Sequence, residues 1–397
     1  MERHTVALVP CASYDMEEVL PAVREGLALL GGVTAFVRPE EKILLKPNLL
    51  SRALPQRAIT THPAVFEAVI VCLREAGCRD LRYGDSPGHP GMTAAKCAEG
   101  CGLKEPADRL GVALADFDHA ETVPFPEGKT ARSFVMCRAI READAVIDLC
   151  KMKTHALERL TGAVKNVYGC VCGLNKGMGH AAWPSSEVFA DMLCDLNRCV
   201  GPRLHIMDGI TAMEGNGPTS GTPIDMKVLL FSADPVALDT VFAYLVDLDP
   251  KLVPTCVSGD RYGLGTMDPD KICLLTPEGE ISLDEAAERY GNKAFDVFRG
   301  KLKKHFLAKV VPLLPCLQDR PRVDLSRCVA CGVCEQACPV PEKAVHSGHG
   351  QKAVYDYKKC IRCFCCQEMC PAKAIEVDHG LMHRLAGRQG SGQRKAK

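Results

Sequence analysis

The sequence lacks an excess of charge of either sign. It has 49 Lys and Arg residues and 49 Asp and Glu residues, which gives a formal net charge of +0. We therefore expect no nucleic-acid partner and no attraction to anionic membranes. A stretch of about 18 uninterrupted apolar residues is also missing, so no transmembrane helix is expected. Because 47% of the residues are hydrophobic and 25% are charged, the composition excludes a disordered chain and a coiled-coil rod.

The N-terminal segment has no basic start followed by an apolar core, because its apolar run ends at Pro10. This differs from a secretory signal, and we expect a cytoplasmic protein. The zinc-protease motif H-E-x-x-H is absent as well. What the chain does have is 23 cysteines. In a reducing cytoplasm we expect clustered cysteines to be metal ligands or redox groups rather than disulfides.

With 397 residues the chain is long enough for two or three domains. We expect residues 1–300 to form an α/β domain and residues 324–380 to form a small cysteine-rich domain. Between them, residues 301–323 are basic and then rich in proline, which predicts a helical and Pro-rich linker. Residues 381–397 are basic and contain Gly and Ser, so we expect a disordered tail.

Short apolar runs alternate with helical patterns over the first 300 residues. The runs predict buried strands at residues 6–10, 42–46, 80–85, 144–150, 203–208 and 226–232. Apolar spacing of i, i+3 and i+4 predicts helices at residues 16–31, 63–76, 158–168, 186–200 and 234–246. This alternation favours an α/β domain with a mostly parallel sheet and helices on both faces. Ligands bind such sheets beyond the carboxyl ends of the strands, which directs attention to the segments KPN, GDSPG, KMKTH and DGITAMEGNGP.

Eight cysteines near the C-terminus form two runs of identical spacing. The runs are Cys328, Cys331, Cys334 and Cys338, and Cys360, Cys363, Cys366 and Cys370, and a proline follows each. The spacing C-x2-C-x2-C-x3-C-P is that of bacterial [4Fe-4S] sites, in which the fourth cysteine ligates the other cluster. We therefore expect two [4Fe-4S] clusters as cofactors, with Cys370 completing the first and Cys338 completing the second. Zinc and a structural or degraded cluster are the alternatives.

Residues 324–380 resemble the bacterial two-cluster ferredoxin at all eight ligand positions. The resemblance implies a small α+β fold, and the repeat of RC…CP by KC…CP implies an internal pseudo-twofold axis. Cys365 is a ninth cysteine, which we expect to be a loop thiol rather than a ligand. The segment has equal numbers of acidic and basic residues, so it lacks an acidic face for a diffusing partner. Tethering by the linker favours clusters that serve the large domain.

Cations and amides cluster in the segments around the strand ends, which favours an anionic ligand, either a phosphate or a carboxylate. Acids in the same segments are candidate acid-base groups or metal ligands. We select His155, Lys153, Lys165 and Asp208 as candidate catalytic residues, and Lys46, Asn48, Asp85, Asn166 and Glu214 as candidate ligand-binding residues. Lys151 and Asp239 belong to the same set. The alternative is that the lysines form a solvated face and the acids cap helices or form ion pairs.

Several long motifs occur in order through residues 5–247: KPNLL, TTHPAVFEAV, GDSPG, KMKTHALERLTGAVKNVYG, DGITAMEGNGPTSG and DPVALD. In these motifs the chain resembles the domain-of-unknown-function family 362, described as iron-sulfur centre proteins. The C-terminal KCIRCFCCQEMCP, with the extra Cys365, is similar to that family's usual ending. The resemblance implies no particular reaction, because none is established for the family. A more distant similarity links such domains to the N-terminal domain of nickel-dependent lactate racemases.

Three functions remain open at this point. The favoured one is an iron-sulfur oxidoreductase whose α/β domain binds an anionic small molecule and exchanges electrons with the clusters, with a redox protein as a second partner. The alternatives are a non-enzymatic electron carrier or cluster-bearing assembly factor, and a racemase or lyase with structural clusters. Cys170 and Cys172 are expected to be buried free thiols. His180 is expected to be either a loop histidine or a general base.

Overall fold

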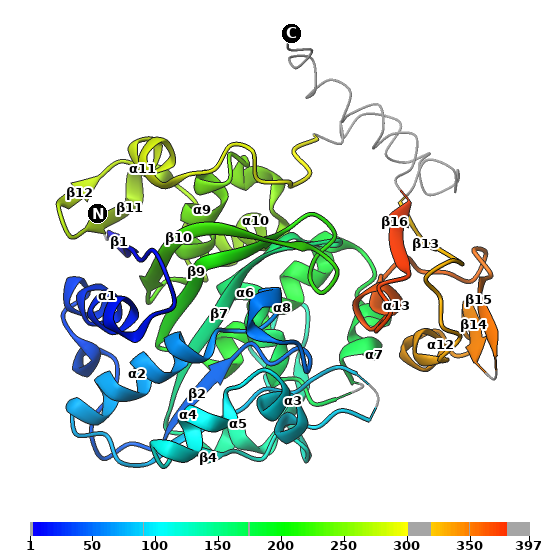
Figure 1. Cartoon of the computed structure of the whole chain (residues 1–397), viewed down its shortest axis with the longest axis horizontal. Coiled ribbons are helices and arrows are strands. Elements are labelled where there is room, and N and C mark those ends of the chain that lie inside the picture. The colour runs from blue at the N-terminus through cyan, green and yellow to red at the C-terminus, as the bar shows by residue number, and fades with distance from the viewer. Residues whose placement is uncertain (1–2, 90, 174, 301–318, 349, 379–397) are drawn as a thin grey trace, which may run out of the picture.

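A ten-stranded sheet forms the centre of the large domain (Figure 1). The strand order is β12-β11-β1-β10-β9-β7-β2-β3-β4, and β8 pairs with β7. Strand β10 is antiparallel to both of its neighbours, and β8 and β12 are hairpin partners, whereas the remaining strands are parallel to one another. The strand bounds are β1 His4–Pro10, β2 Ile43–Pro47, β3 Leu81–Tyr83, β4 Ala113–Leu114, β7 Ala145–His155, β8 Arg159–Thr161, β9 Leu204–Glu214, β10 Thr222–Ser232, β11 Ile272–Thr276 and β12 Gly279–Ile281.

The structure is a computed structural model, and it describes residues 3–89, 91–173, 175–300, 319–348 and 350–378. The predicted linker lies outside the described residues as far as residue 318. The predicted tail at residues 381–397 lies wholly outside them.

Helices cover both faces of the sheet, because successive strand residues point to opposite sides. Leu45 packs with α1 Met16–Leu29 and α2 Pro63–Glu75, whereas its neighbour Leu44 packs on the other side with α8 Ser186–Val200. The other helices of the domain are α3 Ala94–Gly100, α4 Lys104–Arg109, α5 Arg138–Glu142, α6 Ala163–Asn166, α7 Asn175–Ala182, α9 Pro235–Leu245, α10 Pro254–Tyr262 and α11 Leu283–Tyr290. A separate hairpin joins β5 Ala120–Pro124 to β6 Ser133–Cys137. The predicted α/β class with a mostly parallel sheet is confirmed.

Strands β7 and β9 are longer than the sequence predicted. The segments KMKTH and DGITAME continue these two strands instead of following them as loops. The helix predicted at residues 158–168 is wrong in its first part, because Arg159–Thr161 forms strand β8 against the extended end of β7. Lys151, Lys153 and His155 are therefore alternate residues on one side of a strand.

A small α+β module follows, with two antiparallel strand pairs and two short helices (Figure 1). Its elements are β13 Arg320–Val323, α12 Val333–Ala337, β14 Val345–Gly348, β15 Gln351–Tyr355, α13 Cys365–Glu368 and β16 Ile375–Asp378. We call it the cysteine module. Arg320–Val323, from the predicted linker, belongs to this module because it pairs with β16.

The two cysteine loops share their backbone conformation. Ala330 and Arg362 have left-handed φ values of 54° and 60°, and Gly332 and Phe364, two residues further on, have φ values of 78° and 60°. These equivalent positions support the internal repeat predicted from the sequence.

Candidate functional site

The cysteines of the two runs meet in the interior of the cysteine module. Cys334, Cys338 and Cys366 are buried together, and Cys328, Cys360 and Cys370 pack against them. The fourth cysteine of each run accepts a main-chain hydrogen bond on its sulfur, from the Ala344 N–H to Cys338 and from the Ala374 N–H to Cys370, both at 3.3 Å. Hydrogen bonds to sulfur are a feature of iron-sulfur ligands.

The thiols that neighbour Cys334 and Cys360 are those expected from the crossed arrangement, whereas Cys366 also has Cys334 of the other set as a neighbour. Burial raises the pKa of the Cys334 thiol, and the neighbouring thiols that add to this effect are Cys331 and Cys370. Burial likewise raises the pKa of Cys360, whose corresponding neighbours are Cys363 and Cys338. Among the described residues, no three His, Cys, Asp or Glu side chains lie close enough to hold a single metal ion. A cubane instead takes one thiolate on each iron, and the cysteine module has the residues for this.

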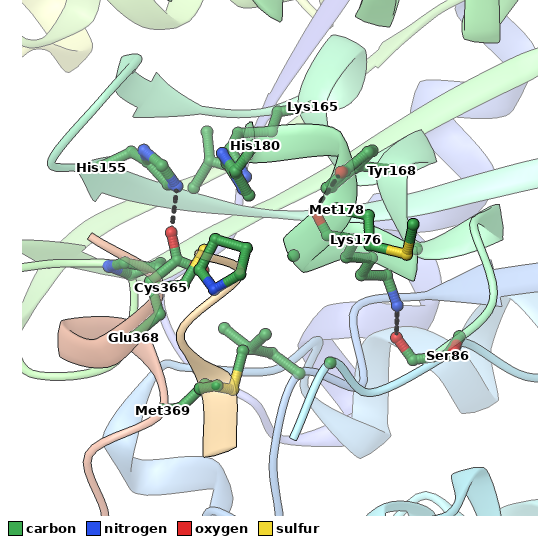
Figure 2. A pocket seen from close by; sticks show the side chains of 18 of the residues that line it. Ser86, His155, Lys165, Tyr168, Lys176, Met178, His180, Cys365, Glu368 and Met369 are labelled. Carbon is green, nitrogen blue, oxygen red and sulfur yellow. Dashed lines mark hydrogen bonds and ion pairs between the residues drawn. The ribbon is translucent and has the colours of Figure 1, made fainter. Parts of the chain in front are cut away.

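A cavity of about 280 Å³ lies between the large domain and the cysteine module (Figure 2). The large domain contributes lysines, histidines and amides beyond the ends of β2 and β7, and the cysteine module contributes α13 and the segment after α12. The lining residues used below are Asn48, Leu50, Asp85, Ser86, Lys153, His155, Lys165, Asn166, Tyr168, Lys176, Met178, His180, Pro218, Cys338, Pro339, Lys343, Cys365, Glu368 and Met369. The lining contains four lysines and two acids, Asp85 and Glu368, so its charge is predominantly positive.

Most of the candidate residues chosen from the sequence come together at this cavity. Those that line it are Asn48, Asp85, Lys153, His155, Lys165 and Asn166. Lys46, Asp208 and Glu214 are not part of the lining. Glu214 accepts a hydrogen bond from the Asp296 N–H at 2.7 Å at the edge of the domain. The catalytic and binding roles of the lining residues remain predictions.

Lys46 and Asp85 form a buried ion pair at 3.1 Å beneath the cavity. Asp85 also accepts the main-chain N–H groups of Leu49 at 2.7 Å and Ser86 at 3.0 Å. Gly169 makes this packing possible, because a Cβ there would lie 1.8 Å from Asp85 Oδ1. Burial is the largest influence on Lys46 and would lower its pKa, but the charges of Asp85 and Asp148 and the hydrogen bond to Asp85 together raise that pKa. Lys46 therefore holds Asp85 and cannot also hold a ligand.

Asp208 belongs to a closed network away from the cavity. Lys151 Nζ lies 2.7 Å from Asp208 Oδ2, and the Tyr14 hydroxyl donates to Asp208 Oδ1 at 2.8 Å. Tyr14 in turn accepts a hydrogen bond from Lys151 at 2.8 Å, and the His62 N–H donates to Asp208 at 2.9 Å. Asp208 therefore has a structural role, in which it connects the segments of Tyr14, His62 and Lys151. This agrees with the alternative that the acids form ion pairs.

None of the four lysines of the lining forms an ion pair with a described residue. Lys176 and Lys343 donate to the carbonyls of Ser86 and Cys338, and Lys153 and Lys165 are the other two. Lys153 Nζ donates to the Ile59 carbonyl at 2.8 Å and to Asn48 Oδ1 at 3.3 Å. Burial lowers the pKa of Lys153 to about 7, and Lys165 lowers it further. Lys165 Nζ lies over the rings of Tyr168 and Phe189, at 5.7 and 5.9 Å from their centres. No hydrogen bond or ion pair joins Lys165 Nζ to another described residue, so this cation is available to an anion.

His155 faces the cysteine module across the cavity (Figure 2). Its Nδ1 accepts the N–H groups of Leu157 and Glu158, at 3.0 and 3.2 Å, so its proton is on Nε2. That Nε2 lies 3.0 Å from Glu368 Oε1 of α13. Burial lowers the pKa of His155 to about 4, and Lys165 contributes to this. A neutral imidazole therefore holds a proton at the cavity wall.

The Gly-rich loop after β9 binds the cysteine module. Gln367 Nε2 donates to the Asn216 side chain at 3.0 Å and to the Asn216 carbonyl at 3.3 Å. The Thr219 hydroxyl donates to the Glu368 carbonyl at 3.0 Å. The segment that follows DGITAME thus holds the cysteine module in place.

Sequence reasoning missed the residues that complete the cavity from other segments. Tyr168 donates to the Lys176 carbonyl at 2.6 Å, and Lys176 donates to the Ser86 carbonyl (Figure 2). Glu368 and Met369 belong to the second cysteine run, whose spacing signals a cluster and gives no sign of a cavity wall. Their placement follows from docking of the module.

Ser86 stands in a G-x-S-x-G segment, Gly84 to Gly88, which is the spacing of a serine-hydrolase nucleophile. That motif requires a strand, a sharp turn and a helix, but the helix after β3 begins only at Ala94. The Ser86 hydroxyl accepts the Gly173 N–H at 2.8 Å, and no hydrogen bond from it to a histidine is present in the described residues. The geometry does not support a nucleophilic serine.

The extra cysteines are buried. Burial raises the pKa of Cys170 to about 12, and Cys172 donates to the Phe117 carbonyl at 3.7 Å. Neither forms a disulfide. Cys365 lines the cavity and is hydrogen-bonded to Cys363.

Glu158 is a buried acid just outside the cavity, and neither carboxyl oxygen has a hydrogen-bond partner among the described residues. Burial raises its pKa to about 8. Because this exceeds the unfolded value of about 4.3, the folded state is progressively destabilised as the pH rises between these values. We predict that Glu158→Gln raises the free energy of unfolding above pH 8 by about 3 kcal/mol, and by much less at pH 5.

Denaturant unfolding of the anaerobic protein at pH 5, 7 and 9 measures this effect. Glu288→Gln, which alters an exposed acid on α11, is the matched control and should leave the pH dependence unchanged. A Glu158→Gln profile parallel to that of the wild type would show that the carboxyl is ionised in the folded protein.

Comparisons with known proteins agree with this division of the chain. The model of the domain of unknown function DUF362 matches residues 43–244, and a 4Fe-4S dicluster domain matches residues 320–371. A thylakoid-associated protein of Synechocystis sp. is 34% identical over 281 residues, which cover 70% of this chain and 86% of that protein. Within the described residues, no helix combines the length and apolar character needed to cross a bilayer.

Two solved structures are similar at low identity. One is the lactate racemase apoprotein of Thermoanaerobacterium thermosaccharolyticum, with 10% identity, a TM-score of 0.39, and coverage of 58% of this chain and 54% of that one. The other is a Thermotoga maritima protein, with 13% identity, a TM-score of 0.35 and coverage of 56% of each chain. The chain thus spans about half the length of the solved structures that it matches.

Proposed function

Because the chain belongs to the DUF362 family and carries a 4Fe-4S dicluster domain, we propose that it is an iron-sulfur oxidoreductase acting on a small anion. The anion would bind in the cavity between the large domain and the cysteine module. Two clusters would exchange electrons with it there.

The observation that carries this proposal is the composition of the cavity wall. Lys165 stands on the side of the large domain without an ion-pair partner among the described residues. Cys338, a predicted ligand of the second cluster, lines the same cavity. Cys365, which is hydrogen-bonded to Cys363, lines it as well. A bound anion would thus lie between a free cation and the sulfur ligands of a redox centre.

When bound, each cluster supplies one electron, and two such electrons complete the reduction of one organic molecule. The residues of the chain do the rest. Lys165 and Lys153 hold the anion, and Met369 and Pro339 exclude water on the side of the cysteine module. The neutral His155 presents its Nε2 proton at the cavity wall, where a reduced product takes up protons. A one-electron donor protein would refill the clusters.

A single-turnover experiment tests the proposal. Small molecules that copurify with the anaerobic protein are extracted, identified by mass spectrometry and added to dithionite-reduced protein, while EPR follows the clusters. We expect an anion that reoxidises the clusters and gains two electrons. With Lys165→Met we expect reoxidation to slow at least tenfold, because the anion loses its free cation, whereas Lys271→Met on the surface should have no effect. The proposal fails if no copurifying anion reoxidises the clusters.

A further inference from the structure

We infer that the anion is a small monocarboxylate with a short apolar chain rather than a phosphorylated compound. This deepens the proposed function, on which it rests, because it concerns the same cavity. Three features of the described residues carry it: occupied main-chain N–H groups, two lysine side chains, and an apolar wall.

Phosphate sites in α/β folds use free main-chain N–H groups at strand ends and helix N-termini. Here the protein's own carboxylates occupy such groups around the cavity. Asp85 accepts the N–H groups of Leu49 and Ser86, the residues that follow β2 and β3. Those donors are therefore not available to a phosphate.

The same holds for the main-chain N–H groups at the start of α6, the helix that contains Lys165. Asp239 accepts the N–H groups of Ala163 and Val164, at 2.7 and 3.1 Å, at the start of α6. Gly162 permits this approach, since a Cβ there would lie 2.0 Å from Asp239 Oδ1. The built-in acid fills the position that a phosphate would take.

The amide side chains are used as well. Asn48 donates to Asn166 Oδ1 at 2.8 Å and accepts from Lys153, and Asn166 donates to Asp148 Oδ1 at 2.7 Å. Lys176 and Lys343, the other two lysines of the lining, donate to the carbonyls of Ser86 and Cys338. What remains for an anion is the ammonium group of Lys165, which makes no hydrogen bond to a described residue, together with that of Lys153. Two point charges of this kind match one carboxylate, whereas a phosphate dianion needs more donors and is repelled by the Glu368 carboxylate across the cavity.

The other part of the cavity suits a hydrocarbon chain. Met369 lies on the opposite side of the cavity from Lys165 (Figure 2), and Met178, Leu50 and Pro218 add apolar surface. The volume of about 280 Å³ is at the lower end of the roughly 300–1,000 Å³ of small-molecule sites. A carboxylate of a few carbon atoms therefore fits both the Lys165 side and the apolar part of the cavity.

Titration calorimetry on the anaerobic holoprotein tests the inference with three compounds of similar shape: propanoate, ethylphosphonate and propanamide. We expect propanoate to bind at least tenfold more tightly than either of the others. Lys165→Met should weaken propanoate binding at least tenfold, while Lys165→Arg, which keeps the charge, should stay within about threefold of the wild type.

Tighter binding of ethylphosphonate, equal binding of the uncharged propanamide, or no binding of propanoate would each overturn the inference. These outcomes differ from failure of the proposed function. If propanoate binds through Lys165 but no copurifying anion reoxidises the clusters, the carboxylate site stands and the electron exchange is wrong.

Discussion

Cys338→Ser is expected to remove one complete cluster from the protein, although Cys338 belongs to the first cysteine run. In the crossed arrangement Cys338 completes the cluster of Cys360, Cys363 and Cys366, and a serine is a poor ligand for a cubane iron. Iron should fall from about eight to about four atoms per chain, with a matching loss of sulfide. Iron and sulfide analysis of anaerobically purified protein, with EPR after dithionite reduction, measures the change.

Two further variants distinguish crossed ligation from ligation of each cluster by a single cysteine run. Cys366→Ser should leave the same remaining EPR signal as Cys338→Ser, while Cys334→Ser should leave the signal of the other cluster. Cys365→Ser is the matched control and should keep about eight iron atoms, because the thiol is adjacent to the ligands without being needed as one. If Cys338→Ser and Cys334→Ser lose the same cluster, the crossed ligation is wrong.

Lys153→Met is expected to make the protein more stable and less able to bind an anion. Lys153 is buried without an acidic partner, which lowers its pKa to about 7. The unfolded chain binds this proton up to about pH 10.4, so the folded state is penalised below that value, fully so below pH 7. Methionine removes the penalty. We expect the free energy of unfolding to rise by about 2–4 kcal/mol at pH 7, with the gain disappearing above pH 10.

Lys151→Met provides the matched control, because Lys151 is two residues away on the same side of β7. Lys151 is paired with Asp208, so its removal leaves a buried carboxylate without its cation and should cost about 3–5 kcal/mol. Denaturant unfolding of both variants between pH 6 and 10 compares them. If Lys153→Met also destabilises the protein, Lys153 has a structural role.

Lys153→Met should also change the affinity for propanoate, because it removes a positive charge from the cavity wall. The Lys153 ammonium is more fully protonated below pH 7, so propanoate affinity should fall as the pH rises from 6 to 8.5 in the wild type. In Lys153→Met we expect weaker binding at pH 6 and a much flatter pH dependence. Calorimetry at both pH values measures this, and an unchanged slope would show that another group titrates.

The sequence was sufficient to predict the α/β class, because β2 and the first part of β7 are short and strongly apolar runs. It could not predict the length of β7, since its final residues, Lys151 to His155, are polar and resemble a loop. They form a strand because β8 and β9 supply hydrogen-bond partners, and this pairing depends on distant residues. The wrong helix at residues 158–168 has the same origin.

The 4Fe-4S dicluster domain was predictable because the spacing of its cysteines is a local property of the chain. The cavity was only partly so. Lys165 and Asp208 look alike in sequence as charged residues near strand ends. In the structure Asp208 forms an ion pair with Lys151, whereas Lys165 forms no ion pair with a described residue. Which charge stays unpaired is decided by strand register. Glu368 could not be predicted, because it reaches the cavity only when the cysteine module docks.

The shared cavity has a thermodynamic consequence. Its walls come from the large domain and the cysteine module, which are in contact through Gln367, Thr219 and the His155–Glu368 pair. A molecule that touches both walls binds best when the parts are together, and by reciprocity it must hold them together to the same degree. Ligand binding in the cavity and docking of the cysteine module on the large domain are therefore thermodynamically coupled. Under the proposed function, the route for electrons would then be most complete when an acceptor is present, which would limit their escape to oxygen when it is not.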